Sequence, residues 1–456
     1  VRDFSINDDS VPAPQRGKYL AFTHTSSRGM QHLQRLARAG LTDVHLLPVF
    51  DLATVPEVGC VTPDIAGLKA TPDSPEPQAL MAKTQERDCF NWGYDPVHYG
   101  APEGSYSRHP DDGEARLREF RAAVMGLHQI GLRVGMDVVY NHVYAAGQQP
   151  HSVLDRVVPG YYLRRSATGA IERSTCCDNT ATEHRMMARL MADTLERWVL
   201  LHGIDSFRFD LMGHQPKAEM LAIEQRLRAR AGRWIPLLGE GWNFGEVADG
   251  RRFDQAAQTV LAGSGIASFN DRLRDALRGG GAGDRGQDMA VRPGWLTQFS
   301  PQDAKPWAAF SQAQQDEAAR RVDALRVGLQ GSLRGLAVPS MARGAQARAD
   351  ELPYGGQVLA YADRPGEAVN YAENHDNLTL WDQLQLKLPA DMPLAQKLRV
   401  QVLAHAMVLL SQGTPYLHAG GELLRSKSLD RNSYDSGDRF NGLDWDGTRH
   451  GFGQGL

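Results

Sequence analysis

A helix, then a glycine, then a short apolar strand is a combination that recurs along this 456-residue sequence. Glycine ends helices because it readily adopts the left-handed conformation that their C-termini require. Gly40, Gly131 and Gly203 each stand between a helical pattern and an apolar run. A fourth helix–strand pair lacks the glycine, and the four strands are expected at residues 43–49, 132–139, 204–210 and 411–418. A repeated helix–strand unit is typical of α/β architectures with parallel strands, and it constrains the fold more than any other feature here.

The third of these strands carries Arg208 and Asp210 near its end, and their spacing of two puts both side chains on one side of the strand. The next apolar run, 234–238, leads directly to Glu240. Residues 216–230 between them are rich in Ala, Leu, Glu and Arg and predict a helix. Parallel strands joined by a helix end at the same edge of the sheet, so Asp210 and Glu240 should lie close together. A structural ion pair at a strand end is the alternative reading of Arg208 and Asp210.

The connections that follow the strands are much longer than those that precede them. An α/β barrel keeps its active site on this long-loop side. We therefore predict a (β/α)8 barrel, the TIM barrel, with long βα-loop insertions over residues 1–456. A small insertion is expected after strand 3 at 141–180, and a long one after strand 6 at 271–362. Residues 1–5 would be the remnant of the first strand, and the chain would be a catalytic fragment truncated at both ends.

Composition excludes several classes of function. The net charge of −4 is spread over mixed signs, which gives no basic surface for nucleic acid. No apolar run is long enough to span a bilayer. The four cysteines are too few for a disulfide scaffold and lack zinc-site spacing, so free thiols are the expectation. A Cys60–Cys89 bridge in an oxidising compartment and a vicinal Cys176–Cys177 disulfide are the alternatives.

More acids and histidines follow two other strands. Asp137 lies inside an apolar strand, where a carboxylate needs a partner, and His142 comes just after that strand. His375 and Asp376 follow another predicted strand, 369–372. A single histidine is more often structural than catalytic. Two histidines, three acids and one arginine at the ends of four strands instead indicate a functional site.

The residue types favour carbohydrate chemistry over a metal site. A divalent cation is the main competing occupant for clustered carboxylates, but the arginine would repel it. Aromatic side chains beside carboxylates and histidines are typical of sites that hold and cleave sugars. The aromatic residues near these strand ends are Trp92, Tyr94, Tyr140, Phe207, Trp242 and Trp381.

The same segments resemble the four short motifs of the α-amylase family, glycoside hydrolase family 13, in the family's order. They are Asp-Val-Val-Tyr-Asn-His at 137–142, Phe-Arg-Phe-Asp at 207–210, Gly-Glu at 239–240 and Asn-His-Asp at 374–376. The stretch Phe-Asn-Trp-Gly-Tyr-Asp-Pro at 90–96 is similar to the Tyr-Asn-Trp-Gly-Tyr-Asp-Pro signature of the debranching members, the pullulanases and limit dextrinases, except that Phe90 replaces tyrosine. Segments 45–54, 207–218 and 422–428 are also similar to these enzymes, so the resemblance covers essentially the whole chain.

This resemblance implies retaining endo-hydrolysis of α-1,6-glucosidic branch linkages in pullulan, limit dextrins and branched α-glucans. It makes Asp210 the nucleophile that forms a covalent glucosyl intermediate, Glu240 the general acid and then base, and Asp376 the stabiliser of the oxocarbenium-like transition state. A retaining mechanism requires about 5–5.5 Å between the Asp210 and Glu240 carboxyl groups. The alternative within the family is an α-1,4-acting amylase or glucanotransferase. A non-catalytic glucan-binding module would lack at least one of the three acids, and all three are present.

The resemblance also implies a set of substrate-binding residues. Arg208 would keep Asp210 ionised, and Tyr94 would be the platform beneath the sugar ring. The other members are Asp95, His142, His375, Trp242 and Asp438. Trp242 would stack on the next sugar. The alternative for Asp438 is that it caps a surface turn. Asn141 matches a calcium ligand of some amylases, so calcium is an open option, whereas no cofactor is expected to be required. The expected partner is an α-glucan, and full-length relatives would add N-terminal carbohydrate-binding modules and a C-terminal β-sandwich.

Overall fold

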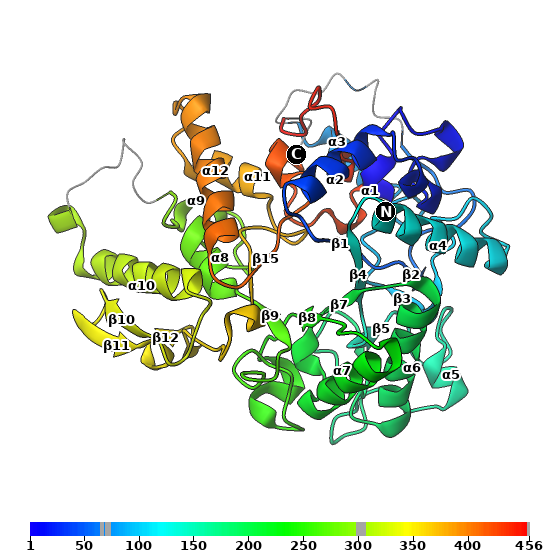
Figure 1. The fold of residues 1–456 in the computed structure, drawn as a ribbon, viewed down its shortest axis with the longest axis horizontal. Coiled ribbons are helices and arrows are strands. Elements are labelled where there is room, and N and C mark those ends of the chain that lie inside the picture. Colours follow the sequence, from blue (N-terminus) through cyan, green and yellow to red (C-terminus); the bar gives the residue numbers. More distant parts are fainter. Residues whose placement is uncertain (64–67, 69–73, 298–306, 454–456) are drawn as a thin grey trace. The chain divides into compact units, whose positions relative to one another are not determined.

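The computed structural model describes residues 1–63, 68, 74–297 and 307–453 of the chain (Figure 1). The chain forms two compact units. The first comprises Val1–Ala70, Ser74–Val260 and Tyr434–Arg449, and the second comprises Thr71–Asp73, Leu261–Ser433 and His450–Leu456. None of the helices in the described residues has the length and apolarity needed to span a bilayer.

Four parallel strands in the order β1-β4-β7-β8 organise the first unit. Its strands are β1 (Asp43–Leu46), β2 (Phe50–Leu52), β3 (Pro96–Pro102), β4 (Arg133–Val138), β5 (His142–Val143), β6 (Asp178–Asn179), β7 (Ser206–Phe209) and β8 (Leu237–Gly239). Its helices are α1 (Arg2–Ser5), α2 (Arg28–Arg38), α3 (Glu76–Ala82), α4 (Gly113–Gln129), α5 (Leu154–Val157), α6 (Arg185–His202), α7 (Lys217–Ala231) and α13 (Gly437–Asn441). Helices α4, α6 and α7 connect successive parallel strands, which confirms the α/β prediction.

The helices that precede the strands begin and end at the residues that local chemistry favours. Asp112 caps α4 by accepting hydrogen bonds from the N–H groups of Glu114 and Ala115. Helix α6 ends at Gly203, whose φ of 76° is left-handed, and α7 ends in the same way at Gly232. A side chain would strain the backbone at these two positions, so the predicted stop at Gly203 is confirmed, and Gly232 adds one that was not predicted.

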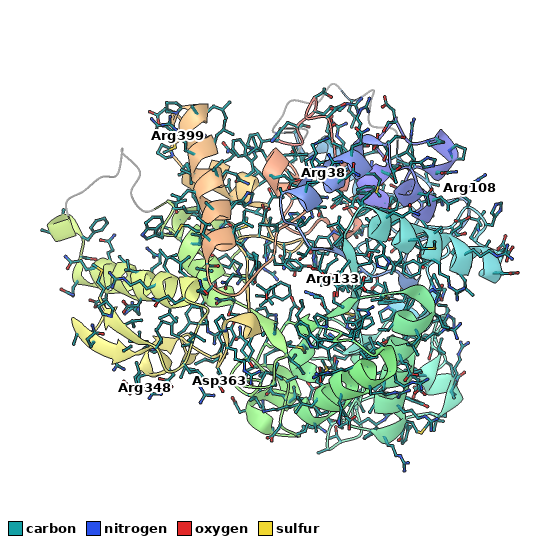
Figure 2. The ribbon with its side chains drawn as sticks, in the orientation of Figure 1. Arg38, Arg108, Arg133, Arg348, Asp363 and Arg399 are labelled. Carbon is teal, nitrogen blue, oxygen red and sulfur yellow. A yellow bond between two sulfur atoms is a disulfide. The ribbon has the colours of Figure 1, made fainter. Side chains whose placement is uncertain are left out.

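Strand register sets which residues meet at the carboxyl edge of this sheet. Asp137 of β4 pairs with Arg208 of β7, and Phe209 of β7 pairs with Gly239 of β8. At the opposite end of the sheet, Arg133 (labelled in Figure 2) forms a two-pronged ion pair with Asp43 at 3.0 and 2.6 Å. The acids that follow β7 and β8 are therefore brought to one edge, as the strand–helix–strand argument predicts.

Two sequence predictions about strands are wrong in detail. Residues 2–5 form α1 and not a strand, because helical spacing of three lets Val1 and Phe4 be buried together, with Phe4 stacked on Phe22 at 4.4 Å. The strand expected over 234–238 begins only at Leu237, the start of β8. Pro236 cannot donate a hydrogen bond to the sheet, so pairing starts after it.

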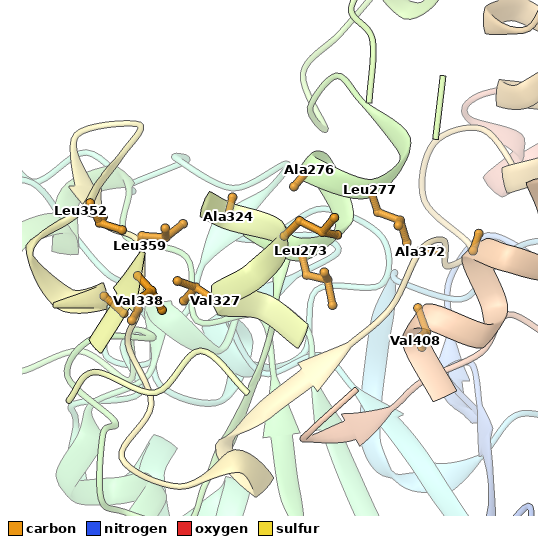
Figure 3. Close-up of a cluster of buried hydrophobic side chains, with 14 of the residues drawn as sticks. Leu273, Ala276, Leu277, Ala324, Val327, Val338, Leu352, Leu359, Ala372 and Val408 are labelled. Atoms are coloured by element: carbon orange, nitrogen blue, oxygen red, sulfur yellow. The ribbon is translucent and has the colours of Figure 1, made fainter. Parts of the chain in front are cut away.

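Three parallel strands in the order β9-β14-β15 belong to the second unit. Its strands are β9 (Ala267–Phe269), β10 (Ala337–Ser340), β11 (Ala345–Arg348), β12 (Pro353–Tyr354), β13 (Gln357–Val358), β14 (Ala368–Asn370) and β15 (Thr414–Pro415). Its helices are α8 (Asp271–Arg278), α9 (Asp288–Val291), α10 (Gln312–Leu329), α11 (Leu380–Lys387) and α12 (Leu394–Leu410). An apolar core joins Leu273 of α8, Val327 of α10 and Val338 of β10 (Figure 3).

The two regions expected to be insertions contain small elements of their own. The range 141–180 holds β5, α5 and β6, with β5 and β6 paired antiparallel. The range 271–362 holds α8 to α10 and two short antiparallel strand pairs. The longest described helix of this range is α10, and residues 298–306 of the range lie outside the described residues.

Candidate active site

The guanidinium group of Arg208 is the centre of a carboxylate cluster at the edge of the first unit's sheet. Its Nη1 lies 3.1 Å from Asp137 Oδ1 and 3.2 Å from Asp210 Oδ1, and its Nη2 lies 2.8 Å from Glu240 Oε1. The Arg208 side chain is only 2% exposed. Burial opposes its charge, but the carboxylates of Asp137 and Glu240 raise the pKa of Arg208 well above its usual value, so it stays cationic.

Both oxygens of the Asp210 carboxylate are held. Oδ1 contacts Arg208, and Oδ2 accepts a hydrogen bond from Asn141 Nδ2 at 3.0 Å. Burial and the negative charge of Glu240 raise the pKa of Asp210 well above its usual value, against the lowering effects of Arg208 and Asn141. Arg208 thus acts in the predicted direction, but burial and Glu240 outweigh it.

Glu240 is fixed by one side chain and one backbone group. Beside the Arg208 contact, its Oε2 accepts a hydrogen bond from the Leu211 N–H at 3.0 Å. Leu211 has a φ of 41°, an unusual left-handed conformation for a leucine. This conformation directly after Asp210 aims a backbone donor at Glu240. Backbone strain of this kind costs about 1–3 kcal/mol and is found at functional sites.

Asp137 and Tyr94 support Arg208 from the other side. The Tyr94 hydroxyl donates a hydrogen bond to Asp137 Oδ2 at 2.5 Å, and the Arg208 guanidinium lies 5.9 Å from the centre of the Tyr94 ring. Burial raises the pKa of Asp137 to about 6, although Arg208 and Tyr94 both lower it. The buried carboxylate thus has the partner that the sequence demanded, and Tyr94 is fixed through it.

The charge balance of this cluster decides what it can do chemically. Three ionised carboxylates around one guanidinium would leave two uncompensated negative charges in a buried site, so the cluster retains protons near neutral pH. Asp210 and Glu240 are close enough through Arg208 to titrate as a pair. When one of them carries a proton, the other is ionised more easily. One nucleophilic carboxylate and one proton-donating carboxyl are the pair that a retaining glycosidase uses.

His142 lies beside Tyr94. Its Nε2–H donates a hydrogen bond to the Tyr94 carbonyl oxygen at 2.8 Å. Burial lowers the pKa of His142 to about 4, with the Tyr94 hydrogen bond acting in the opposite direction. The imidazole is therefore neutral at neutral pH, and it can exchange hydrogen bonds with uncharged hydroxyl groups.

Only part of the predicted aromatic set can touch a ligand. Tyr140 and Phe207 are fully buried, and Trp92 and Trp381 nearly so. Tyr94 and Trp242 keep partial exposure. The four buried rings are packed in the interior, which leaves Tyr94 and Trp242 as the more exposed members of this set.

No family model matches the chain. It is 44% identical to pullulanase 1, chloroplastic, of Arabidopsis thaliana over all of this chain and 48% of that protein. It is 41% identical to the pullulanase of Klebsiella aerogenes over 98% of this chain and 43% of that protein. Over nearly its whole length, the chain is similar to these pullulanases and to that of Bacillus subtilis.

Solved pullulanase structures have the same fold. Klebsiella pneumoniae pullulanase complexed with maltotriose matches 99% of this chain and 46% of its own, with a TM-score of 0.91 and 39% identity. A mutant pullulanase from Paenibacillus barengoltzii complexed with maltotetraose matches 98% of this chain with a TM-score of 0.72 and 31% identity. The chain spans about half the length of the Arabidopsis thaliana and Klebsiella pullulanases named above.

The second unit carries the other residues of the pullulanase-like motifs. His375 Nε2 lies 3.7 Å from Asp376 Oδ1, and the Asp376 side chain is 42% exposed. The Asp376 N–H donates to Asn374 Oδ1 at 3.0 Å. The preceding Glu373 is buried and contacts His418 at 3.2 Å. That Asp376 joins Asp210 and Glu240 at one sugar stays a prediction.

The remaining predicted site residues have other immediate partners. Asp95 Oδ2 accepts a hydrogen bond from the Thr54 hydroxyl at 2.7 Å, and burial raises the pKa of Asp95. Asp438 forms a two-pronged ion pair with Arg2 at 2.7 and 2.6 Å, within the first turn of α13. Its carboxylate is thus engaged at the N-terminus of the chain. Asn141 donates to Asp210 through its amide nitrogen, and its buried Oδ1 has no hydrogen-bond partner among the described residues.

The cysteines are paired, which corrects the expectation of free thiols. Cys60 bonds to Cys89, and Cys176 bonds to its neighbour Cys177. The Cys60–Cys89 pairing closes a loop of 29 residues, and the Cα atoms lie 5.0 Å apart. Sequence spacing alone does not bring two distant Cβ atoms together, so only the folded chain reveals the pairing.

Sequence reasoning missed two members of the active-site cluster. Asp137 was predicted to need a partner but was given no place in the site. The signal that could have found it is its β4 position, in register with Arg208. The Leu211 N–H was also missed. A backbone donor leaves no trace in residue type, so the sequence offers no signal for it.

Proposed function

We propose that this chain hydrolyses α-1,6-glucosidic branch linkages in pullulan, limit dextrins and branched α-glucans, with retention of configuration. The observation that carries the proposal is the pair Asp210 and Glu240, which share the buried cation Arg208 and lie on adjacent parallel strand ends. Whole-chain similarity to pullulanases supports the choice of linkage. The similarity of 90–96 to the debranching signature favours α-1,6 over α-1,4 cleavage.

In the first step, an ionised Asp210 oxygen attacks the anomeric carbon while Glu240 gives its proton to the departing glycosidic oxygen. A bond forms between the Asp210 carboxylate and the sugar, and the carbon–oxygen bond to the leaving chain breaks. In the second step, Glu240 takes a proton from water, and the resulting hydroxide displaces Asp210. The sugar is released with its original configuration.

The proton that this reaction needs is supplied by the coupled pair. Asp210 is difficult to ionise while Glu240 is negative, because burial and the Glu240 charge both raise its pKa. Placing the retained proton on Glu240 removes that repulsion and lets Arg208 and Asn141 stabilise the Asp210 anion. The contacts of Glu240 with Arg208 and the Leu211 N–H favour its ionised form. We infer that a bound glycosidic oxygen moves the proton to Glu240 by replacing one of these contacts.

The other residues receive their roles from the resemblance. Asp376 stabilises positive charge on the sugar ring in the transition state. Tyr94 is held by Asp137 and presents its ring to the sugar, and His142 and His375 bind sugar hydroxyl groups. Trp242 stacks on the sugar beyond the scissile bond. The same proposal includes a fold that closes as a (β/α)8 barrel with βα-loop insertions. It also includes a mechanism that needs no cofactor.

The decisive experiment is digestion of pullulan followed by sizing of the products. Maltotriose supports α-1,6 cleavage, whereas panose or isopanose indicates α-1,4 cleavage and overturns the proposal. Asp210→Asn should abolish turnover. Glu240→Gln should lower the rate on pullulan by about 10²–10⁴-fold, with a smaller loss on a glycosyl fluoride, whose leaving group needs no proton.

Glu224→Gln is the matched control for these two variants. Glu224 is a half-exposed carboxylate on α7, so the same chemical change there should leave the rate unaltered. Full activity in Asp210→Asn, or equal losses in Glu240→Gln and Glu224→Gln, would exclude the proposed catalytic pair.

A further inference from the structure

The first unit contains a histidine and two cysteines that lie close enough to share one ion. Ligand atoms of His142, Cys176 and Cys177 all lie within 4.8 Å of one another. The two sulfurs are joined as a disulfide, and Cys176 is exposed whereas His142 is buried. None of these groups takes part in the carboxylate cluster around Arg208. One buried nitrogen and two sulfurs at the surface are a ligand set for thiophilic metals.

The spacing of the nitrogen and the first sulfur suits tetrahedral coordination. Cys176 Sγ lies 3.6 Å from His142 Nε2. Zinc bonds of about 2.3 Å to sulfur and 2.0–2.1 Å to nitrogen, at a tetrahedral angle, separate the two ligand atoms by about 3.6 Å. The two sulfurs would need to move apart to about 3.8 Å, which requires that their bond be reduced.

The segment that carries the cysteines is held in place without the disulfide. Strand β6 pairs with β5, so that Asn179 lies opposite His142. The Asn179 amide donates to Glu246 at 3.0 Å, and the Thr175 hydroxyl donates to Asn179 Oδ1 at 2.5 Å. Because these contacts bracket both cysteines, the two thiols formed by reduction stay beside His142.

His142 can present a ring nitrogen to a metal ion. Its Nδ1 is buried and has no hydrogen-bond partner among the described residues. The proton on Nε2 can therefore move to Nδ1, which frees the Nε2 lone pair for a metal. The cost is the hydrogen bond from Nε2 to the Tyr94 carbonyl oxygen.

A second cluster of possible ligands is already occupied by protein cations. Asp51, Glu57 and Glu103 also lie within 4.8 Å of one another. Arg116 pairs with Glu57, and His98 lies 2.5 Å from Asp51. Metal binding there would have to displace both basic partners, so the histidine–cysteine group is the stronger candidate.

We propose that reduction of the Cys176–Cys177 disulfide creates a site for a thiophilic divalent cation, Zn²⁺ or Cd²⁺, with His142 as the third ligand. A dithiol reductant supplies two electrons and two protons, becomes a cyclic disulfide, and leaves two thiols on the chain. The cation then binds both sulfurs and releases their two protons, and water fills the fourth position. Occupancy withdraws His142 from sugar binding and inhibits hydrolysis; this last consequence rests on the proposed function.

The binding test uses Cd²⁺ alone and the whole chain, reduced with a dithiol and then desalted. Reduced protein should bind one equivalent and develop the ultraviolet thiolate-to-cadmium absorption band, and oxidised protein should not. Cys176→Ser/Cys177→Ser should lose the band, and His142→Asn should weaken binding. Cys60→Ser/Cys89→Ser, which removes the other disulfide, should bind as the unaltered chain does. A reduced chain without the band, or a band that survives Cys176→Ser/Cys177→Ser, would overturn the proposal.

The activity test separates this proposal from the proposed function. Reduced enzyme with Cd²⁺ should hydrolyse pullulan about tenfold more slowly, the effect of losing one hydrogen bond to the sugar, and a chelator should restore the rate. Cys176→Ser/Cys177→Ser should resist Cd²⁺. If the oxidised chain has no activity, the proposed function fails while the absorption band still tests the site. If the chain is active and the band absent, only the metal site fails.

Discussion

Replacement of Arg208 by methionine tests whether this one cation stabilises the carboxylate cluster. Methionine has a similar length but no charge, so Asp137, Asp210 and Glu240 lose contacts of 3.1, 3.2 and 2.8 Å in a site where Arg208 is 2% exposed. Removing one partner from a buried charge network costs about 3–5 kcal/mol of unfolding free energy. With an unfolding entropy of about 2.1 cal/mol/K per residue, a 456-residue chain shifts by roughly 1 °C per kcal/mol, so the melting temperature should fall by roughly 3–5 °C.

The loss should depend on pH in a defined direction. Burial raises the pKa of Asp137 to about 6 in the folded chain, above its ordinary value, and removing Arg208 raises it further. At pH 5, Asp137 is protonated in both proteins, so the variant loses less. As the pH rises through about 6, Asp137 of the unaltered protein ionises, and its negative charge is paired with Arg208. In the variant, Asp137 must either keep its proton or carry a buried charge that has no cationic partner. The stability difference therefore grows between pH 5 and pH 8.

Thermal unfolding of both proteins at pH 5 and pH 8 measures this effect. The matched control is Arg226→Met, which also removes an arginine with two carboxylate partners, Asp193 at 2.6 Å and Glu196 at 2.7 Å, but from a side chain that is 38% exposed. Surface ion pairs contribute about 0–1 kcal/mol, so that variant should change little at either pH. If Arg208→Met loses no more stability than Arg226→Met, or loses the same amount at both pH values, the argument about the buried cluster is wrong.

Three further predictions follow from the same site. Tyr94→Phe removes the hydroxyl that donates to Asp137 at 2.5 Å, and the loss of this hydrogen bond should cost about 1.5–3 kcal/mol in a denaturant titration; an unchanged midpoint would contradict it. Gly213→Ala puts a Cβ 2.1 Å from the Trp242 carbonyl oxygen, so it should lower the free energy of unfolding by about 1–3 kcal/mol and reduce activity. Gly113 has open space around it, so Gly113→Ala should change neither stability nor activity. Dialysis against a chelator should leave the initial rate on pullulan unchanged, and complete loss of turnover would indicate a metal-dependent hydrolase.

The pairing of Asp210 with Glu240 could be predicted because it depends on short-range rules. Helical periodicity, a glycine stop and an apolar run identify a strand–helix–strand unit, and the direction of the connection decides which strand ends meet. The structure confirms helix α7 between β7 and β8, with Arg208 in contact with both acids. The resemblance to the debranching enzymes then named the chemistry, and whole-chain similarity to pullulanases agrees with it.

The sequence by itself therefore determined the α/β class and the neighbouring strand ends that carry Asp210 and Glu240, because both follow from periodicity within a few dozen residues. Only the tertiary structure decided that Asp137 shares Arg208, that the Leu211 N–H holds Glu240, and that Cys60 pairs with Cys89. Each of these depends on strand register, a left-handed backbone angle or the approach of distant segments. Such features arise from the balance of many weak contacts across the fold, and no local pattern of residues encodes them.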